Sequence, residues 1–209
     1  MAYISNKEIK AIIKENNRQI KALQKRNKSY TKDDYITKMK DENNVVEFEN
    51  LHTYFYTDNG IVKAVNGVTY EVPKNKIVGI VGESGCGKSV SSLSLMRLIQ
   101  GPSGQIVEGS IRFKTKIDKL DEKGKKIPIY TNEKDEKGNL IQAKDKNGFY
   151  MFEEEEVTYD IAKMPLKEMY KIRGKDITMI FQEPMTSLNP VFTIGNQLDE
   201  VSFLHNHAD

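Results

Sequence analysis

The stretch that decides the fold reads Gly82-Glu83-Ser84-Gly85-Cys86-Gly87-Lys88-Ser89. It fits without exception the pattern of a glycine, four residues and then Gly-Lys-Ser. A continuous apolar run at 77–81 precedes it, and 90–99, free of proline and glycine, follows it. These patterns predict a buried parallel strand, a glycine-rich loop and a helix that stops at Gly101-Pro102.

This order of elements gives the loop a specific chemistry. Glycines let the backbone fold so that its N–H groups point at a phosphate, and the following helix N-terminus adds partial positive charge. We expect Lys88 to reach the β- and γ-phosphates of ATP and the Ser89 hydroxyl to ligate Mg²⁺. The alternative, a glycine turn with an incidental lysine, is disfavoured by the flanking strand and helix patterns.

Cys86 lies inside the loop, where its backbone amide does the binding. Its side chain is either a small neutral filler or a reactive thiol, because a helix N-terminus and a neighbouring lysine both stabilise a thiolate. We expect alkylation of Cys86 to block ATP binding and ATP to protect the thiol. Equal alkylation rates with and without ATP would contradict this.

Composition excludes several classes of protein. The 209 residues fit one ordinary domain with appendages, and the single cysteine excludes an internal disulfide. No apolar run approaches the roughly 18 residues of a membrane span, and no signal-peptide core is present at the N-terminus. We therefore expect a protein of the cytoplasm.

Charge divides the chain unevenly. Residues 1–40 hold eleven Lys and Arg against four Asp and Glu, a net of +7, which leaves −5 for the remainder of a chain whose total is +2. Residues 1–44 are interpreted as a basic arm, partly helical or disordered, with isoleucines at near-helical spacing. The arm is either a solvated extension or a surface attracted to an anionic membrane or a nucleic acid.

The ordered body is expected to begin at Val45. Residues 45–49 and 54–56 have the composition of strands, 58–60 reads as a turn, and 64–72 resumes the strand pattern up to Pro73.

From about 114 to 157 the composition becomes charged. Short apolar pieces separated by glycine turns predict a small antiparallel meander there, and the acidic run 153–156 is interpreted as a solvated strand end. After it, 166–173 predicts a helix stopped by Gly174, and 176–181 a second buried strand. No internal repeat is visible.

Three stretches together resemble the ATP-binding subunit of an ABC transporter, in the oligopeptide, dipeptide and nickel importer branch. They are Asn50–Phe55 with Ala64–Val68, the loop region Gly79–Ser89, and Met179–Pro190, which resembles the Q-loop of that branch. With the framework between them they cover roughly half of the chain. The resemblance implies an α/β fold. It is an incomplete P-loop NTPase core of the ABC ATPase type, 45–209, whose antiparallel β-subdomain carries the charged segment as an insertion.

The resemblance also assigns roles to individual residues. Phe55 is implied to stack on adenine, although Tyr54 and Tyr56 are rivals. Gln182 is implied to complete the coordination of Mg²⁺ and to position the attacking water, and the residues after it to face a coupling helix of a membrane subunit. The implied cofactors are ATP and Mg²⁺. The implied nucleotide-binding set is Phe55, Gly82, Glu83, Ser84, Gly85, Cys86, Gly87, Lys88 and Ser89, with Lys88 and Gln182 as catalytic residues.

Members of the family work at the cytoplasmic face of the membrane with integral permease subunits and a second ATP-binding subunit in a head-to-tail dimer. A full subunit also carries a Leu-Ser-Gly-Gly-type signature, a second acidic strand motif with the catalytic Glu, and a switch His. The sequence up to Asp209 contains none of these, and His205 and His207 follow Gln182 too closely to serve as the switch. The expectation is an N-terminal piece of such a subunit, which binds ATP weakly and does not turn it over alone.

Two alternatives stay open. One is a non-catalytic nucleotide-binding fragment or interaction module. The other is a soluble ABC protein acting on nucleic acid, which the basic arm favours and the Q-loop wording disfavours, so that no nucleic-acid partner is expected. The sequence leaves the choice among oligopeptide, dipeptide and nickel cargo undecided.

Overall fold

The computed structural model describes residues 5–146, 148–182 and 188–205, the side chains of 201–205 excepted. The chain forms two compact units: residues 1–114 with 158–179, and residues 115–157 with 180–209. Each unit is treated by itself below.

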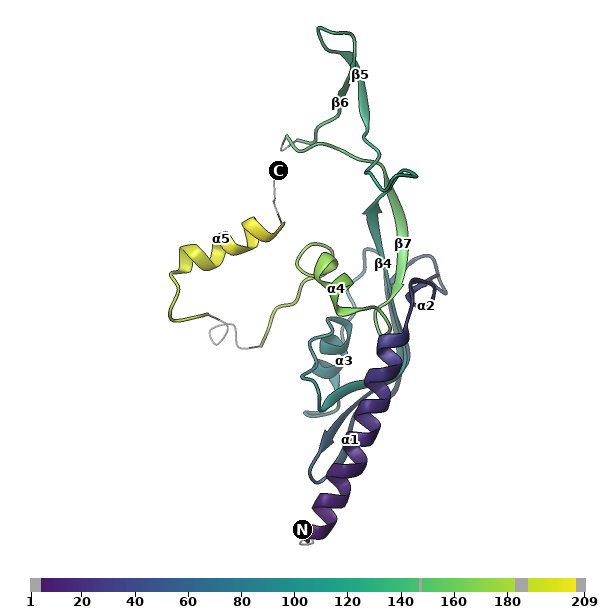
Figure 1. Cartoon of the computed structure of the whole chain (residues 1–209), viewed down its shortest axis with the longest axis vertical. Helices are drawn as coiled ribbons and strands as arrows, with labels where there is room; N and C mark the ends of the chain where they lie inside the picture. Colours follow the sequence, from purple (N-terminus) through teal and green to yellow (C-terminus); the bar gives the residue numbers. More distant parts are fainter. Residues whose placement is uncertain (1–4, 147, 183–187, 206–209) are drawn as a thin grey trace. The chain divides into compact units, whose positions relative to one another are not determined.

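A twisted antiparallel sheet organises the first unit (Figure 1). Its strand order is β1-β7-β4-β2-β3, and the pairs β1–β7, β2–β3 and β2–β4 are all antiparallel. The strands are β1 (Ile36–Thr37), β2 (Asn44–Thr57), β3 (Gly60–Pro73), β4 (Gly104–Asp118) and β7 (Glu154–Asp160).

The first hairpin agrees with its sequence pattern. Strand composition at 45–49 and 54–56 becomes one continuous strand, β2, and the predicted turn at 58–60 leads directly into β3. Gly60 has φ +123°, a conformation that side-chain-bearing residues rarely adopt. The hairpin prediction is therefore confirmed, whereas β1 and β4 have no predicted counterpart.

The buried core of this unit lies between the sheet and the segments 90–99, 161–164 and 169–177. Fully buried Leu51 and Ile111 meet Ile161 and Met169 there. Helix α3 (Lys88–Leu95) is joined to the sheet by a buried contact of 2.9 Å between the hydroxyls of Ser94 and Thr53. This contact fixes the helix that follows the glycine-rich loop.

Helix α3 ends four residues before the end of the predicted helix 90–99, and two arginines hold the chain at this point. Arg97 adopts φ +51°, and its guanidinium donates hydrogen bonds to the carbonyls of Ile161, Ala162 and Met164 at 2.6–3.2 Å. Arg173 donates to the carbonyls of Met96 and Arg97 at 2.8 and 2.9 Å. Long-range capping of this kind has no signature in the local sequence.

Arg173 itself follows α4 (Leu166–Ile172), which is the helix predicted at 166–173. Gly174, at φ +79°, stops it as expected. Prediction and structure agree here because the start and stop signals are local.

The basic arm forms a long helix, α1 (Asn6–Ser29), followed by the single turn α2 (Lys32–Tyr35). A capping box between Ser5 and Glu8 starts α1. The Asn16 side chain then donates to the Thr57 carbonyl at 2.9 Å, and Arg26 donates to the Val107 carbonyl at 3.0 Å. The helix is thus attached to the sheet at its middle and near its C-terminal end (Figure 1).

The two strands predicted for a parallel core sheet are absent from the part of the chain that the structure describes. Residues 77–81 belong to no strand, and Ile77 and Val81 are 101% and 94% exposed. Residues 178–181 are likewise irregular, with Ile180 93% exposed, and Ile177 makes one isolated bridge to Arg173. A buried parallel strand exists only between neighbours, and no described strand pairs with these runs. The antiparallel β-subdomain of the predicted α/β fold is thus present, with helices beside it, whereas the predicted parallel strands are corrected to irregular segments.

The second unit contains the charged insertion, whose strands are β5 (Tyr130–Lys134) and β6 (Leu140–Gln142), and the helix α5 (Ile194–His205). Instead of a simple meander, the insertion branches. The backbones of Lys119, Glu153 and Ile127 form a closed ring of three hydrogen bonds, in which each N–H donates to the carbonyl of the next residue. The backbones of 129, 151 and 143 form a second ring of the same kind. Each ring is a junction of three two-stranded arms.

A repeated turn ends three of those arms, which corrects the expectation of no internal repeat. The sequences 121–125, 135–139 and 145–149 all read Asp-x-x-Gly-x. In each, the aspartate carboxylate accepts the backbone N–H four residues later, at 2.8–3.0 Å, and the glycine has φ between +75° and +89°. The repeat is too short and too varied around the two fixed positions to stand out in a search for longer periods.

No helix among the described residues is both long and apolar enough to cross a bilayer.

Candidate nucleotide-binding site

The glycine-rich loop leads into α3 through Gly87, the residue before the first helical turn. Gly85 and Gly87 have φ +81° and +94°, so both use the conformational freedom for which the pattern selects glycine. A Cβ atom on Gly87 would lie 2.3 Å from the carbonyl oxygen of Ala64 on β3. Strand β3 therefore supports the loop from behind, at a contact that excludes any side chain at position 87.

Lys88 is the first residue of α3, and its ammonium group folds back over the loop. Nζ donates to the carbonyls of Gly82 and Glu83, both at 2.7 Å, and lies 3.6 Å from Cys86 Sγ. The lysine thus spans the loop from its last residues to its first.

The other loop side chains are open to solvent. Cys86 is a free, exposed cysteine, and Glu83, Ser84 and Ser89 are exposed. Because Ser89 is the second residue of α3, its hydroxyl lies at the helix N-terminus, beside the lysine. Among the described residues, no cluster of three or more His, Cys, Asp or Glu could hold a metal ion.

Strand alternation distinguishes the three aromatic candidates on β2. Thr53 contacts Ser94 of α3, and Phe55 lies on the same face of the strand because side chains alternate with a period of two. Tyr54 lies on the other face, where its hydroxyl donates to Asn66 at 2.7 Å, and Tyr56 is buried at 8% exposure. Of the three rings, only half-buried Phe55 lies on the α3 face.

Gln182 is exposed and belongs to the second unit, whereas the loop belongs to the first. Most of the remaining Q-loop residues, 183–187, lie outside the described residues.

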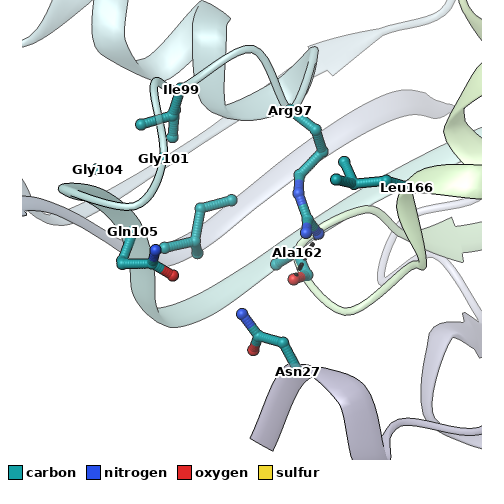
Figure 2. A pocket seen from close by; sticks show the side chains of 9 residues that line it. Asn27, Arg97, Ile99, Gly101, Gly104, Gln105, Ala162 and Leu166 are labelled. Carbon is teal, nitrogen blue, oxygen red and sulfur yellow. Dashed lines mark hydrogen bonds between the residues drawn. The ribbon is translucent and has the colours of Figure 1, made fainter. Parts of the chain in front are cut away.

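A separate cavity lies where α1 meets the sheet, and no loop residue lines it (Figure 2). Asn27 of α1 points into it, and the Arg97 guanidinium lies along the wall formed by Ala162. Its volume of about 140 Å³ is below the roughly 300 Å³ at which ligand pockets begin. The Arg97 guanidinium already donates hydrogen bonds to three backbone carbonyls, which indicates a structural role for this arginine.

Two supports of the loop were missed by sequence reasoning, the Ala64 carbonyl and the hydroxyl pair of Thr53 and Ser94. A backbone carbonyl leaves no trace in residue type. The hydroxyl pair could in principle be found in the sequence, because each element has a polar residue on its inner face. Pairing the two residues, however, requires knowing that the two elements contact each other.

Comparison of the sequence with known proteins identifies the family of this chain. The family model described as ABC transporter matches residues 65–208. Two Bacillus subtilis proteins are similar: the oligopeptide transport ATP-binding protein AppD (36% identical over 163 residues) and the dipeptide transport ATP-binding protein DppD (37% over 161 residues). These alignments cover 78% and 77% of this chain. The Escherichia coli glutathione import ATP-binding protein GsiA is 33% identical over 168 residues, 80% of the chain.

The chain spans only part of these relatives, 37% of AppD, 35% of DppD and 21% of GsiA. The match by the family model nevertheless covers well over half of the chain and includes the loop, its lysine and the Q-loop region. The chain belongs to the ABC transporter family and is similar to its ATP-binding proteins of peptide import.

Proposed function

We propose that this protein binds MgATP through the loop 82–89 and serves as the ATP-binding subunit of an ABC transporter that imports peptides. The observation that supports ATP binding best is the Lys88 ammonium, held 2.7 Å from two carbonyls of the loop at the start of α3. The printed functions of the relatives, transport of oligopeptides and dipeptides and import of glutathione, support peptide as the cargo class.

Each loop group has a defined task in this proposal. The backbone N–H groups around Gly85 and Gly87 receive the β-phosphate, assisted by the partial positive charge of the α3 N-terminus. Lys88 leaves the carbonyls of Gly82 and Glu83 and binds the β- and γ-phosphate oxygens. Ser89 donates its hydroxyl oxygen to Mg²⁺, which neutralises phosphate charge when bound.

Two residues outside the loop complete the proposed site. Phe55 stacks on adenine, supported by its position on the α3 face of β2. Gln182 adds a ligand to Mg²⁺ and positions the attacking water, in keeping with the resemblance of its surroundings to a Q-loop. Hydrolysis is proposed for the whole transporter, with permease subunits and a second ATP-binding subunit at the cytoplasmic face of the membrane.

Peptide uptake by whole cells tests the transporter role. Cells that depend on this subunit should lose uptake of a labelled oligopeptide when Lys88→Ala replaces the natural residue, while uptake of an amino acid by another system continues. Lys63→Ala, an exposed lysine on β3, is the matched control and should retain uptake. Undiminished peptide uptake in the Lys88→Ala strain would refute the role.

A further inference from the structure

Helix α1 carries a straight stripe of positive charge. Seven Lys and Arg residues recur at intervals of three or four along it, and all seven are exposed. They are Lys7, Lys10, Lys14, Arg18, Lys21, Lys25 and Lys28. At about 100° per residue these positions fall within an arc of roughly 80°, and at 1.5 Å per residue they extend over about 32 Å. We refer to these seven residues as the basic stripe.

The stripe lies opposite the face by which α1 is attached. The partly or fully buried residues Ile9, Ile12, Asn16, Ile20 and Leu23 centre on the other side of the helix. Because the apolar face is used against the sheet, the stripe is presented outward on a fixed helix. The helix that presents the stripe is therefore positioned by its contacts with the sheet.

The charge of the stripe is largely uncompensated. Within the described part of the chain, one ion pair reaches it, from Arg18 to Glu15 at 3.7 Å, and the Arg18 side chain is 82% exposed. Successive members are like-charge neighbours at i,i+3 or i,i+4, a spacing that destabilises a helix. A face that serves only solubility normally alternates charge sign and gains stability from the same spacing. The stripe therefore has an arrangement that stability does not favour.

We propose that the basic stripe binds the anionic headgroups of the membrane surface and so attaches the protein directly to lipid. The proposal rests on the proposed function in one respect, namely that the protein works beside a membrane. Six of the seven residues are lysine, a compact charge suited to diffuse attraction, where bidentate recognition of bases and phosphates favours arginine. Helix α1 also contains no aromatic residue on which a base could stack.

The attachment is electrostatic adsorption. The outward arc holds no large apolar side chain, since Ile9, Ile12 and Ile20 lie on the opposite side of the helix, so α1 does not insert into the acyl region. Each basic residue near an anionic leaflet strengthens partitioning roughly fivefold, and salt weakens the attraction. The net charge of the chain is only +2, so strong adsorption requires the local stripe.

Flotation with lipid vesicles tests the proposal on the 209-residue chain without nucleotide. We expect binding to vesicles with 30% phosphatidylglycerol in phosphatidylcholine at 50 mM salt, and none to pure phosphatidylcholine. The variant K14Q/R18Q/K21Q should lower the partition coefficient on the order of 100-fold. The control K123Q/K134Q/K137Q removes the same charge from exposed lysines of the insertion and should bind like the natural chain. K14R/R18K/K21R keeps every charge and should also bind.

Three results would overturn the proposal. They are no binding of the natural chain to anionic vesicles, equal loss in the insertion control, and tighter binding of a 20-base-pair DNA or RNA duplex at the same salt. Circular dichroism of each variant verifies that α1 is intact. Titration of the same proteins with MgATP is independent of lipid, so failure of lipid binding is distinguishable from failure of the proposed ATP binding.

Discussion

At the scale of single residues, Gly87 shows how closely the loop depends on its support. Its positive φ alone would tolerate another residue at a cost of about 1–2 kcal/mol, but the Ala64 carbonyl leaves no room for a Cβ atom. Gly85 shares the positive φ and has nothing within 4 Å of a Cβ atom, so it is the natural comparison.

We therefore predict that Gly87→Ala distorts the loop and weakens MgATP binding at least tenfold more than Gly85→Ala does. The physical reason is a backbone clash present at one position and absent at the other. Calorimetric titration of both variants measures the difference. Equal affinities would mean that the contact with β3 does not shape the loop.

Glu47 is a buried carboxylate, 5% exposed, that holds the chain before β2. It accepts the backbone N–H groups of Lys40 and Asp41, each at 2.9 Å, and the Asn44 side chain at 3.1 Å. Burial alone would raise the pKa of Glu47, but these hydrogen bonds and the nearby Arg112 charge hold its pKa below the ordinary value.

A lowered pKa in the folded state stabilises the fold above the unfolded pKa of about 4.3, and this stability is lost as pH falls through the folded pKa. We predict that Glu47→Gln lowers the free energy of unfolding by about 1.5–3 kcal/mol at pH 7 and flattens its decrease below pH 4. Urea unfolding at several pH values measures this, with exposed Glu122→Gln as the control. A slope identical to that of the natural chain would contradict the assignment.

At the scale of elements, the structure separates what local sequence determines from what distant contacts determine. The β2–β3 hairpin and α4 could be predicted because the residues that form the turn and end the helix lie within or directly beside these elements. The end of α3 was not, since Arg97 and Arg173 fix it through carbonyls more than 60 residues away in sequence. The runs 77–81 and 176–181 have the composition of buried strands, but a strand also needs neighbours that composition cannot supply.

The same division applies to the candidate site. The loop pattern predicts the phosphate-binding residues because each role belongs to one residue type at a fixed spacing, and their roles stay predictions. The choice among the three aromatics required the strand register, which placed Thr53 and Phe55 on the α3 face. The basic stripe follows from the spacing of Lys and Arg in the sequence, but which side of α1 faces outward follows only from the contacts of the helix with the sheet.

The charged insertion contributes no residue to the buried core of the first unit. Every buried residue of that core lies outside 115–157. We predict that replacing 119–153 by Asn-Gly, a two-residue hairpin turn between β4 and β7, changes the free energy of unfolding of the first unit by less than about 1 kcal/mol. Thermal unfolding followed by circular dichroism measures it. Failure of the shortened chain to fold would show that the insertion supports the sheet.

At the scale of the whole molecule, the described structure joins the glycine-rich loop 82–89 to an antiparallel sheet, while Ile77, Val81 and Ile180 are almost fully exposed. The chain spans about a third of AppD and DppD. The loop and its supports, β3 and α3, nevertheless lie within the first unit. The proposed phosphate binding therefore requires only residues of the first unit, whereas the proposed transport requires the whole transporter.

Isothermal titration of the 209-residue chain with MgATP is the most direct test, with Lys88→Ala measured beside it. We predict saturable binding with one site per chain and a loss of at least tenfold in affinity for Lys88→Ala at unchanged circular dichroism. No binding at millimolar MgATP by the folded natural chain, or equal binding by the variant, would contradict the assignment of 82–89 as an ATP-binding loop.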